Sequence, residues 1–351
     1  MKKLLLSSLF VLAMYNLTLC QDADEISELT QTFLESLSEA QKNEIQYTFE
    51  NTLRNNWTNL PIGLAKRPGV QYGALSESSM IAFHKILTTL FSSQGYLKTT
   101  SIMQMDDILN LWVKTAKERG QMDDETVQKL EDLQWDYKNY YVSIYGKPDP
   151  VEPWGLKFEG HHISYNLTIA DHYLSVTPLF LGIDPAEVPI TQFAGIRVMS
   201  KEEDYGIWLI NALDEEQKAK ATLSQDVPSD ILTNPENDQA LDTYQGITAN
   251  EFDENQRDIL RILIGEYLHN LEHEKAHEYM SKIEGTGLDN IYFAWIGSYE
   301  ARKPSYYVIN GPDFMIEYDN ARGNHIHTIW REKDNDFGEN LLRTHYETHK
   351  H

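Results

Sequence analysis

Hydrophobic residues recur at every third or fourth position through most of the first 145 residues of this 351-residue chain. The spacing is clearest between residues 26 and 37 and between residues 80 and 90. Such spacing places apolar side chains on one face of an α-helix. We therefore predict helices from about Ile26 to Tyr145, interrupted at Leu60–Gly63 and Arg67–Gly69, where proline and glycine break the pattern.

Beyond residue 153 apolar and polar residues alternate, which is typical of β-strands. Leu156–Ile169 and Tyr173–Leu181 are predicted to pair as a hairpin that turns at Ala170–His172. Helical spacing then returns at Lys201–Leu223 and in one long predicted helix at Phe252–Ile283. The segment between these helices, residues 224–248, is rich in proline, asparagine and aspartate, and we expect it to be a surface excursion.

The C-terminal part has four strand-like runs joined by short turns: Ile291–Gly297, Ser305–Asn310, Phe314–Asn320 and His325–Arg331. Short turns between consecutive strands imply an antiparallel meander. A short helix is expected after Gly338. Because no internal repeat or long linker divides the chain, residues 21–351 are predicted to form a single large α+β domain. Its helical N-terminal half would pack with an antiparallel sheet of hairpins and meander.

The first twenty residues resemble a secretory signal peptide, with two lysines ahead of an apolar stretch from Leu4 to Leu19. We therefore expect a secreted, periplasmic or cell-surface protein. Cys20 is the only cysteine, so the mature chain has no disulfide and no thiolate nucleophile. Cys20 itself has two interpretations: it precedes an ordinary cleavage site, or it carries the lipid anchor of a bacterial lipoprotein.

Acidic residues outnumber basic ones by 54 to 30, which gives a formal net charge of −24. Binding to nucleic acid depends on clustered lysine and arginine, so this composition argues against it. No later segment is long and apolar enough to be a transmembrane helix. The expected partner is a small-molecule or polymer substrate of unknown identity.

The most informative stretch is Phe314–His327, two predicted strands with a polar turn. Side chains of the same parity share a face of a strand, so Glu317, Asp319, His325 and His327 are predicted to share one. A turn at residues 320–324 would place Asp319 opposite His325 and Glu317 opposite His327. His-x-His on a strand presents two imidazoles to one metal ion, and a nearby carboxylate can serve as ligand or general base. The alternative is a solvated polar face.

A second histidine pair lies in Glu159–His162. Adjacent residues of a strand point to opposite faces, so only one of His161 and His162 is expected in a given site. The polar residues that follow favour His162, although a bulge at Gly160 would reverse this.

Two further motifs have competing interpretations. His273-Glu274-x-x-His277, on a predicted helix, matches the zinc-binding pattern of metalloproteases, but it also suits an exposed charged helix face. Near the C-terminus, Asp336 is a candidate for orienting a histidine, and His345 a candidate for a further metal ligand. An ordinary turn and helix cap explain these two residues equally well.

Several of these motifs, in order along the chain, resemble the exported proteins of domain-of-unknown-function family 3500. They lie at residues 140–146, 154–162, 177–182, 293–297, 306–307, 316–320, 324–327 and 336–338. The resemblance implies one continuous domain and marks His161, His162, His325 and His327 as family features. It implies no activity, and it places the His273–His277 pair outside the family's motifs.

We therefore expect an exported metal-dependent hydrolase. Metal ligands would come from His161, His162, His325, His327 and His345, and Glu317, Asp319 and Asp336 would act in catalysis. Zinc is the first choice of divalent ion, and iron, manganese or copper would suit the same residues, leaving redox chemistry open. The alternatives are a non-catalytic, secreted or lipid-anchored protein that binds a small molecule or glycan, and a zinc metalloprotease acting through His273, Glu274 and His277.

Overall fold

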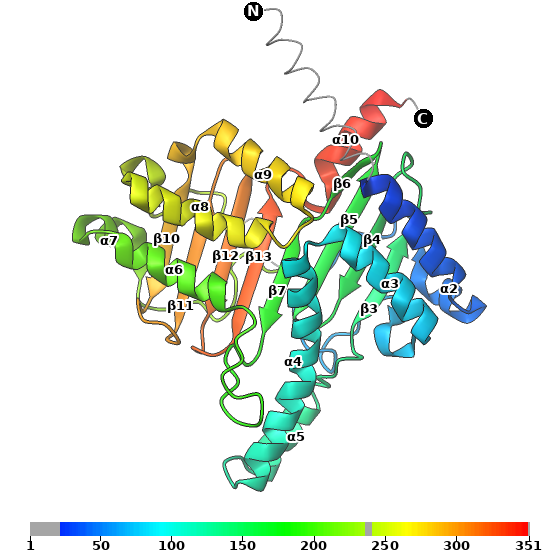
Figure 1. The fold of residues 1–351 in the computed structure, drawn as a ribbon, viewed down its shortest axis with the longest axis horizontal. Helices are drawn as coiled ribbons and strands as arrows, with labels where there is room; N and C mark the ends of the chain where they lie inside the picture. Colours follow the sequence, from blue (N-terminus) through cyan, green and yellow to red (C-terminus); the bar gives the residue numbers. More distant parts are fainter. Residues whose placement is uncertain (1–21, 236–240, 350–351) are drawn as a thin grey trace, which may run out of the picture.

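The fold is built around one mixed β-sheet, which has thirteen strands in the part of the chain described by the computed structural model, residues 22–235 and 241–349 (Figure 1). The predicted signal peptide and Cys20 lie outside the described residues. The strands are β1 Gln46–Tyr47, β2 Val70–Gln71, β3 Tyr141–Tyr145, β4 Trp154–Glu159, β5 Ile163–Ala170, β6 Tyr173–Ser175, β7 Leu179–Ile183, β8 Thr222–Ser224, β9 Ile247–Thr248, β10 Tyr292–Gly297, β11 Ser305–Asn310, β12 Phe314–Asn320 and β13 Ile326–Glu332.

Neighbouring strands follow the order β1-β3-β4-β5-β7-β13-β12-β11-β10-β8, while β2, β6 and β9 pair at the side with β3, β5 and β10. Two pairs, β1 with β3 and β8 with β10, are parallel, and the other pairs are antiparallel. The predicted antiparallel meander is confirmed for β10 to β13. The prediction of a purely antiparallel sheet is wrong.

The described residues form helices at residues 22–35 and at α2 Glu39–Ile45, α3 Glu77–Leu90, α4 Ser93–Glu118, α5 Asp124–Glu131, α6 Ser200–Ala212, α7 Glu215–Ala221, α8 Glu254–Leu268, α9 His273–Thr286 and α10 Glu339–Thr348. Many begin at a side chain that accepts a hydrogen bond from the first turn, as Ser38 and Asp253 do within complete capping boxes. In the described chain no helix is both long and apolar enough to cross a membrane.

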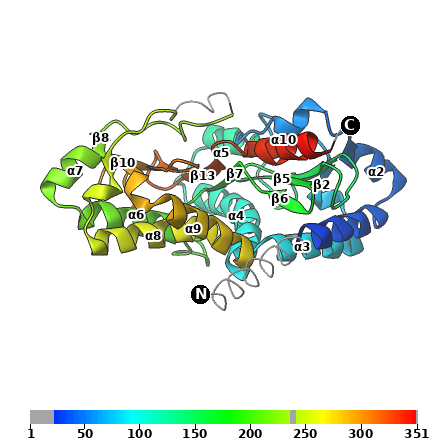
Figure 2. The ribbon, with the colours of Figure 1, turned by 90° about the horizontal axis from the view of Figure 1, so that it is seen from above.

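Helices and strands alternate along the chain, so the predicted helical N-terminal half is only partly correct. Strand β3 lies inside the region predicted to be helical, because its aromatic and β-branched residues favour a strand and form buried contacts in the sheet. The helix predicted at Phe252–Ile283 is two helices, α8 and α9, separated at residues 269–272. Figure 2 shows α3, α6, α8 and α9 on one side of the sheet and α10 on the other.

The central strands of the sheet bring segments that are distant in sequence together at one end of these strands. Strands β5, β7, β13 and β12 are consecutive neighbours. The turn before β5, the end of β7 and the turn between β12 and β13 therefore lie together, beside the helical arm formed by α4 and α5 (Figure 1). These connections carry both histidine pairs identified in the sequence.

Candidate metal centre

The first histidine pair occupies a tight turn rather than a strand. Gly160 donates its backbone N–H to the carbonyl of Ile163 at 2.8 Å, so His161 and His162 form the tip of the turn between β4 and β5. The prediction that the two histidines point to opposite faces is wrong, because a turn does not alternate its side chains as a strand does. Gly160 is required here: a Cβ atom would lie 2.3 Å from the Tyr140 ring.

The second pair lies in a hairpin whose register differs from the prediction by two residues. Asp319 pairs with His327, Glu317 pairs with Ile329, and His325 lies in the turn before β13. The turn is longer than predicted because its polar residues form contacts outside the hydrogen-bond ladder of β12 and β13. Asn324 holds the backbone of the segment after β7 through Ala186 N–H at 2.9 Å and Glu187 N–H at 2.7 Å.

Three imidazoles, two from these turns and His327 from the start of β13, converge on the Nε2 atom of His325. His325 Nε2 lies 3.1 Å from His162 Nε2 and 3.0 Å from His327 Nε2. Two histidine nitrogens bound to one ion at ordinary zinc distances lie about 2.9–3.4 Å apart. His161 lies beside them, and its ligand atom is within 4.8 Å of those of His162 and His325. The structure therefore brings all four predicted histidines together.

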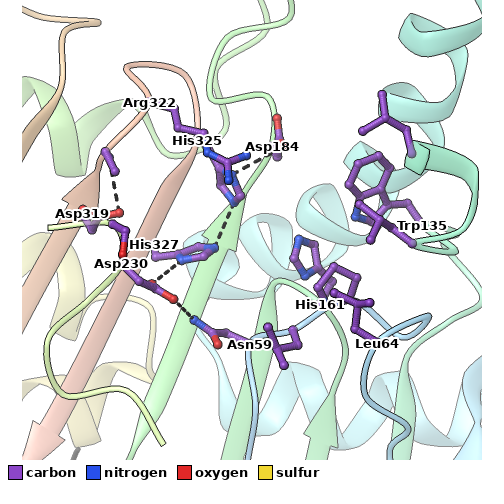
Figure 3. A pocket seen from close by; sticks show the side chains of 16 residues that line it. Asn59, Leu64, Trp135, His161, Asp184, Asp230, Asp319, Arg322, His325 and His327 are labelled. Atoms are coloured by element: carbon purple, nitrogen blue, oxygen red, sulfur yellow. Dashed lines mark hydrogen bonds and ion pairs between the residues drawn. The ribbon is translucent and has the colours of Figure 1, made fainter. Parts of the chain in front are cut away.

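Carboxylates lie on the Nδ1 side of the same three imidazoles. Asp230 hydrogen-bonds to His327 Nδ1 at 2.7 Å (Figure 3). Asp184 lies 3.5 Å from His325 Nδ1, and Asp106 lies 3.8 Å from His162 Nδ1. Metal-binding histidines commonly direct their second nitrogen to a carboxylate, which orients the ring and fixes its tautomer.

Hydrogen bonding alone does not explain the convergence. A neutral imidazole nitrogen has either one proton or one lone pair, so His325 Nε2 cannot form good hydrogen bonds with both neighbours. In a neutral His327, an Nδ1 proton donated to Asp230 would leave a lone pair on the Nε2 atom. A shared cation would satisfy these Nε2 atoms at once.

Burial favours the neutral form of His161, His162 and His325. Desolvation lowers the pKa of His162 and of His325 well below the ordinary value, and neighbouring histidines lower both further. Desolvation also lowers the pKa of His161 to about 3, with further lowering by His327 and Arg67. Metal ions bind the neutral form of histidine, so these ligands need no deprotonation at neutral pH.

Asp319 is the carboxylate most suited to proton transfer. It is 3% exposed, its Oδ1 atom has no hydrogen-bond partner in the described chain, and desolvation raises its pKa to about 7. Asp230 differs: burial alone would raise its pKa, but hydrogen bonds from His327 and Asn59 lower it below the ordinary value. Ligand atoms of Asp230, Asp319 and His327 all lie within 4.8 Å of one another.

Glu317 and Asp336 support the site from a distance. Glu317 is fully buried and accepts hydrogen bonds from Leu232 N–H at 2.7 Å, Thr233 N–H at 3.0 Å and the Thr233 hydroxyl. Arg331 donates to the Thr233 carbonyl at 2.8 Å and also pairs with Asp336. These contacts fix the segment that carries Asp230. The catalytic role predicted for the two acids stays a prediction, and the contacts seen here are structural.

His345 lies in a different cluster. Its Nδ1 atom is 2.9 Å from Asp171, which also contacts His349 at 2.8 Å, and this group joins α10 to the turn between β5 and β6. The prediction that His345 reaches the histidine site is therefore wrong.

The His273–His277 pair lies at the start of α9, and both side chains are exposed. The helix prediction is confirmed for this segment. In the described residues, neither histidine belongs to a group of three close metal-ligating side chains.

Sequence reasoning missed Asp106, Asp184 and Asp230. Asp106 had a detectable signal, because it lies on the apolar face of α4 with Ile102 and Leu109, where an acid is unexpected. Asp230 belongs to the segment predicted to be a surface excursion. That segment instead buries Ile231, Thr233 and Leu241, and so brings Asp230 to His327.

A cavity of about 320 Å³ opens onto the site. Figure 3 shows the polar side chains of His325, His327, Asp230 and Asp319 on one side of the cavity, and His161 across from them beside Leu64 and Trp135. The opposite wall is apolar and consists of Leu60, Pro61, Leu64, Leu130, Leu133 and Trp135. The volume of the cavity lies at the lower end of the range for small-molecule sites.

Gly182 in β7 allows two of the ligand rings to approach. An added Cβ atom would lie 2.7 Å from His327 Cδ2 and 2.8 Å from His162 Cδ2. We expect Gly182→Ala to push the rings apart and weaken metal binding by about 10- to 100-fold, as disturbed supporting contacts do. Gly285→Ala is the control, because its Cβ would meet nothing within 4 Å. Equal zinc affinity of both variants, measured by competition with a chelating dye, would contradict this expectation.

Comparison with known proteins confirms the resemblance seen in the sequence. The model of the family described as protein of unknown function, DUF3500, matches residues 20–339. No curated protein and no solved structure matches the chain.

Proposed function

This chain belongs to the DUF3500 family, which has no assigned function, and from its own residues we propose that it is a metal-dependent hydrolase. The observation that carries the proposal is the position of His325 Nε2, which lies 3.1 Å from His162 Nε2 and 3.0 Å from His327 Nε2. We assign these three as ligands, with His161 as a further candidate. Zinc is the metal to test first, since imidazole suits it, and iron, manganese and copper remain alternatives.

The proposed chemistry is hydrolysis at the polar wall of the cavity. A divalent ion in such a site lowers the pKa of a bound water. Asp319 has an unpartnered oxygen on the same wall and would accept the proton of the attacking water. Asp230 would hold His327 in the correct tautomer. We also propose that the protein acts after export, on the evidence of its apolar N-terminal segment.

Metal analysis and an Asp319→Asn variant test this proposal together. We expect purified protein to hold one stoichiometric metal ion and to hydrolyse some members of a panel of 4-nitrophenyl esters and anilides of apolar acids. Asp319→Asn should retain the metal and lose about 10²- to 10⁴-fold in rate, the usual contribution of a general base. Asp226→Asn, an exposed acid in the same segment as Asp230, is the matched control.

Three results would overturn the proposal: absence of any metal, unchanged hydrolysis in Asp319→Asn, or bound metal with no hydrolysis of any substrate. The last result would favour the non-catalytic binding protein, which the apolar wall of the cavity supports. The metalloprotease alternative has less support, because His273 and His277 are exposed and have no third ligand close by in the described residues. Retained peptide cleavage in Glu274→Gln would eliminate it.

A further inference from the structure

A second cavity of about 230 Å³ borders the cavity above the histidines. The second cavity is lined mainly by apolar residues of the helical arm, which include Leu109, Trp112, Val113 and Met122. Five residues line both cavities: Leu130, Trp135, Asp184, Arg322 and His325. The junction between the two spaces therefore lies beside a proposed metal ligand.

The apolar surface continues to the outside of the molecule. At the mouth of the first cavity, Leu60 is 48% exposed and Leu64 is 65% exposed. Exposed apolar side chains around a concave site commonly mark a ligand-binding groove. An apolar ligand body has a matching surface from this rim to the inner wall at Leu133 and Trp135.

Arg322, in the turn between β12 and β13, is the only lysine or arginine in the lining of either cavity. It is exposed, and the described part of the chain gives it no hydrogen bond and no ion pair. Asp184 lines the same junction but lies more than 4.0 Å from the guanidinium and faces His325. The charge of Arg322 acts on Asp184, but the two form no direct ion pair in the described residues, so the guanidinium can still donate hydrogen bonds to an external anion.

The side chain of Trp135 lines the same junction. Its side chain is 8% exposed, and its indole N–H is buried without an acceptor in the described residues. An unsatisfied buried donor costs about 1–3 kcal/mol, so a ligand oxygen that accepts from it would be stabilised. Arg322 thus offers hydrogen-bond donors at a junction where the one carboxylate, Asp184, faces His325, and the buried indole N–H of Trp135, a residue of the same lining, has no acceptor in the described residues.

From these features, and resting on the proposed hydrolase function, we propose that the substrate is a small carboxylic acid with an aromatic or branched apolar body. Its carboxylate would bind at Arg322, within reach of Trp135, while the apolar body would pack on Leu60, Leu64 and Leu133. The reacting group would then lie over the histidines. Asp230 pairs with His327, while Asp184 faces His325 and Asp319 faces His327. These acids would repel an anion placed directly beside the histidines.

Calorimetric titration with matched probes tests the assignment. The probes are 3-phenylpropanoate, its neutral amide, the cationic 3-phenylpropylamine, and acetate, which has the charge without the apolar body. We expect 3-phenylpropanoate to bind at least tenfold more tightly than the other three. Arg322→Gln should remove this preference and leave the amide affinity within twofold. Arg343→Gln, an exposed arginine on α10 outside both cavities, is the charge-matched control and should change nothing.

Each titration is repeated on zinc-loaded and chelator-treated protein, which separates this inference from the proposed function. A preference for the acid that persists without zinc and depends on Arg322 supports the carboxylate subsite, whatever the metal analysis shows. A preference that vanishes with zinc and survives Arg322→Gln would assign the carboxylate to the metal and overturn the subsite alone. Tighter binding of the amine or amide, or no binding of any probe at millimolar concentration, would also overturn it.

Discussion

Replacing both His325 and His327 by alanine is expected to abolish metal binding and, with it, hydrolysis. The two residues supply two of the three converging Nε2 atoms. Loss of a supporting contact alone typically costs 10- to 100-fold in metal affinity, so removal of two ligands should cost at least about a thousandfold. The variant should still fold, because both side chains lie at one end of the central strands and outside the apolar core. Metal content and near-UV circular dichroism provide the two measurements.

The matched control is His273→Ala/His277→Ala, which removes the same number of imidazoles from an exposed helix face. This variant should keep its metal and its activity. If the control loses the ion while His325→Ala/His327→Ala retains it, the metal centre lies on α9 and the assignment made above is wrong.

The second large effect is expected from Glu317→Ala. The carboxylate accepts hydrogen bonds from two backbone N–H groups and two hydroxyls, including that of Tyr306 at 2.7 Å. Removing it leaves buried donors without partners beside Arg331, so we expect the free energy of unfolding to fall by about 3–5 kcal/mol. Because Leu232 and Thr233 belong to the segment that carries Asp230, zinc affinity should fall as well.

Tyr306→Phe isolates one contact of the same group, since it removes a single hydrogen bond to Glu317 and keeps the ring. It should cost about 1 kcal/mol and leave zinc affinity nearly unchanged. Urea unfolding gives the stabilities, and dye competition gives the affinities. A Glu317→Ala protein with normal stability but no hydrolysis would restore Glu317 to a direct catalytic role.

Local patterns predicted the meander well, because apolar alternation and short turns determine strands and their neighbours. The bounds of β11 and β12 agree with the prediction residue for residue. The histidine cluster was predictable in kind, since His-x-His and adjacent histidines are rare combinations. Its register was not, because Asn324 draws the turn toward the segment after β7 through contacts that sequence spacing does not show.

Other features depend on tertiary contacts alone. Asp230 reaches His327 only because Glu317 and Arg331 hold residues 232 and 233 against the sheet. Asp106 approaches His162 only because α4 crosses the edge at which the turn between β4 and β5 lies. Neither pairing leaves a spacing pattern along the chain. The prediction of one helix at Phe252–Ile283 was wrong because residues 269–272 contain no proline or glycine that would mark a break, yet the backbone turns there.

The pairing of β7 with β13 joins the strands encoded early in the chain to those encoded late, and the histidines lie across this seam. His162 and His325 are 163 residues apart in sequence. Contacts of such separation close a long loop and form late in folding. An ion bound to both sides would act as a cross-link at the seam, so its removal should first loosen the docking of the two halves, and amide hydrogen exchange at β7 and β13 should rise before that within either half.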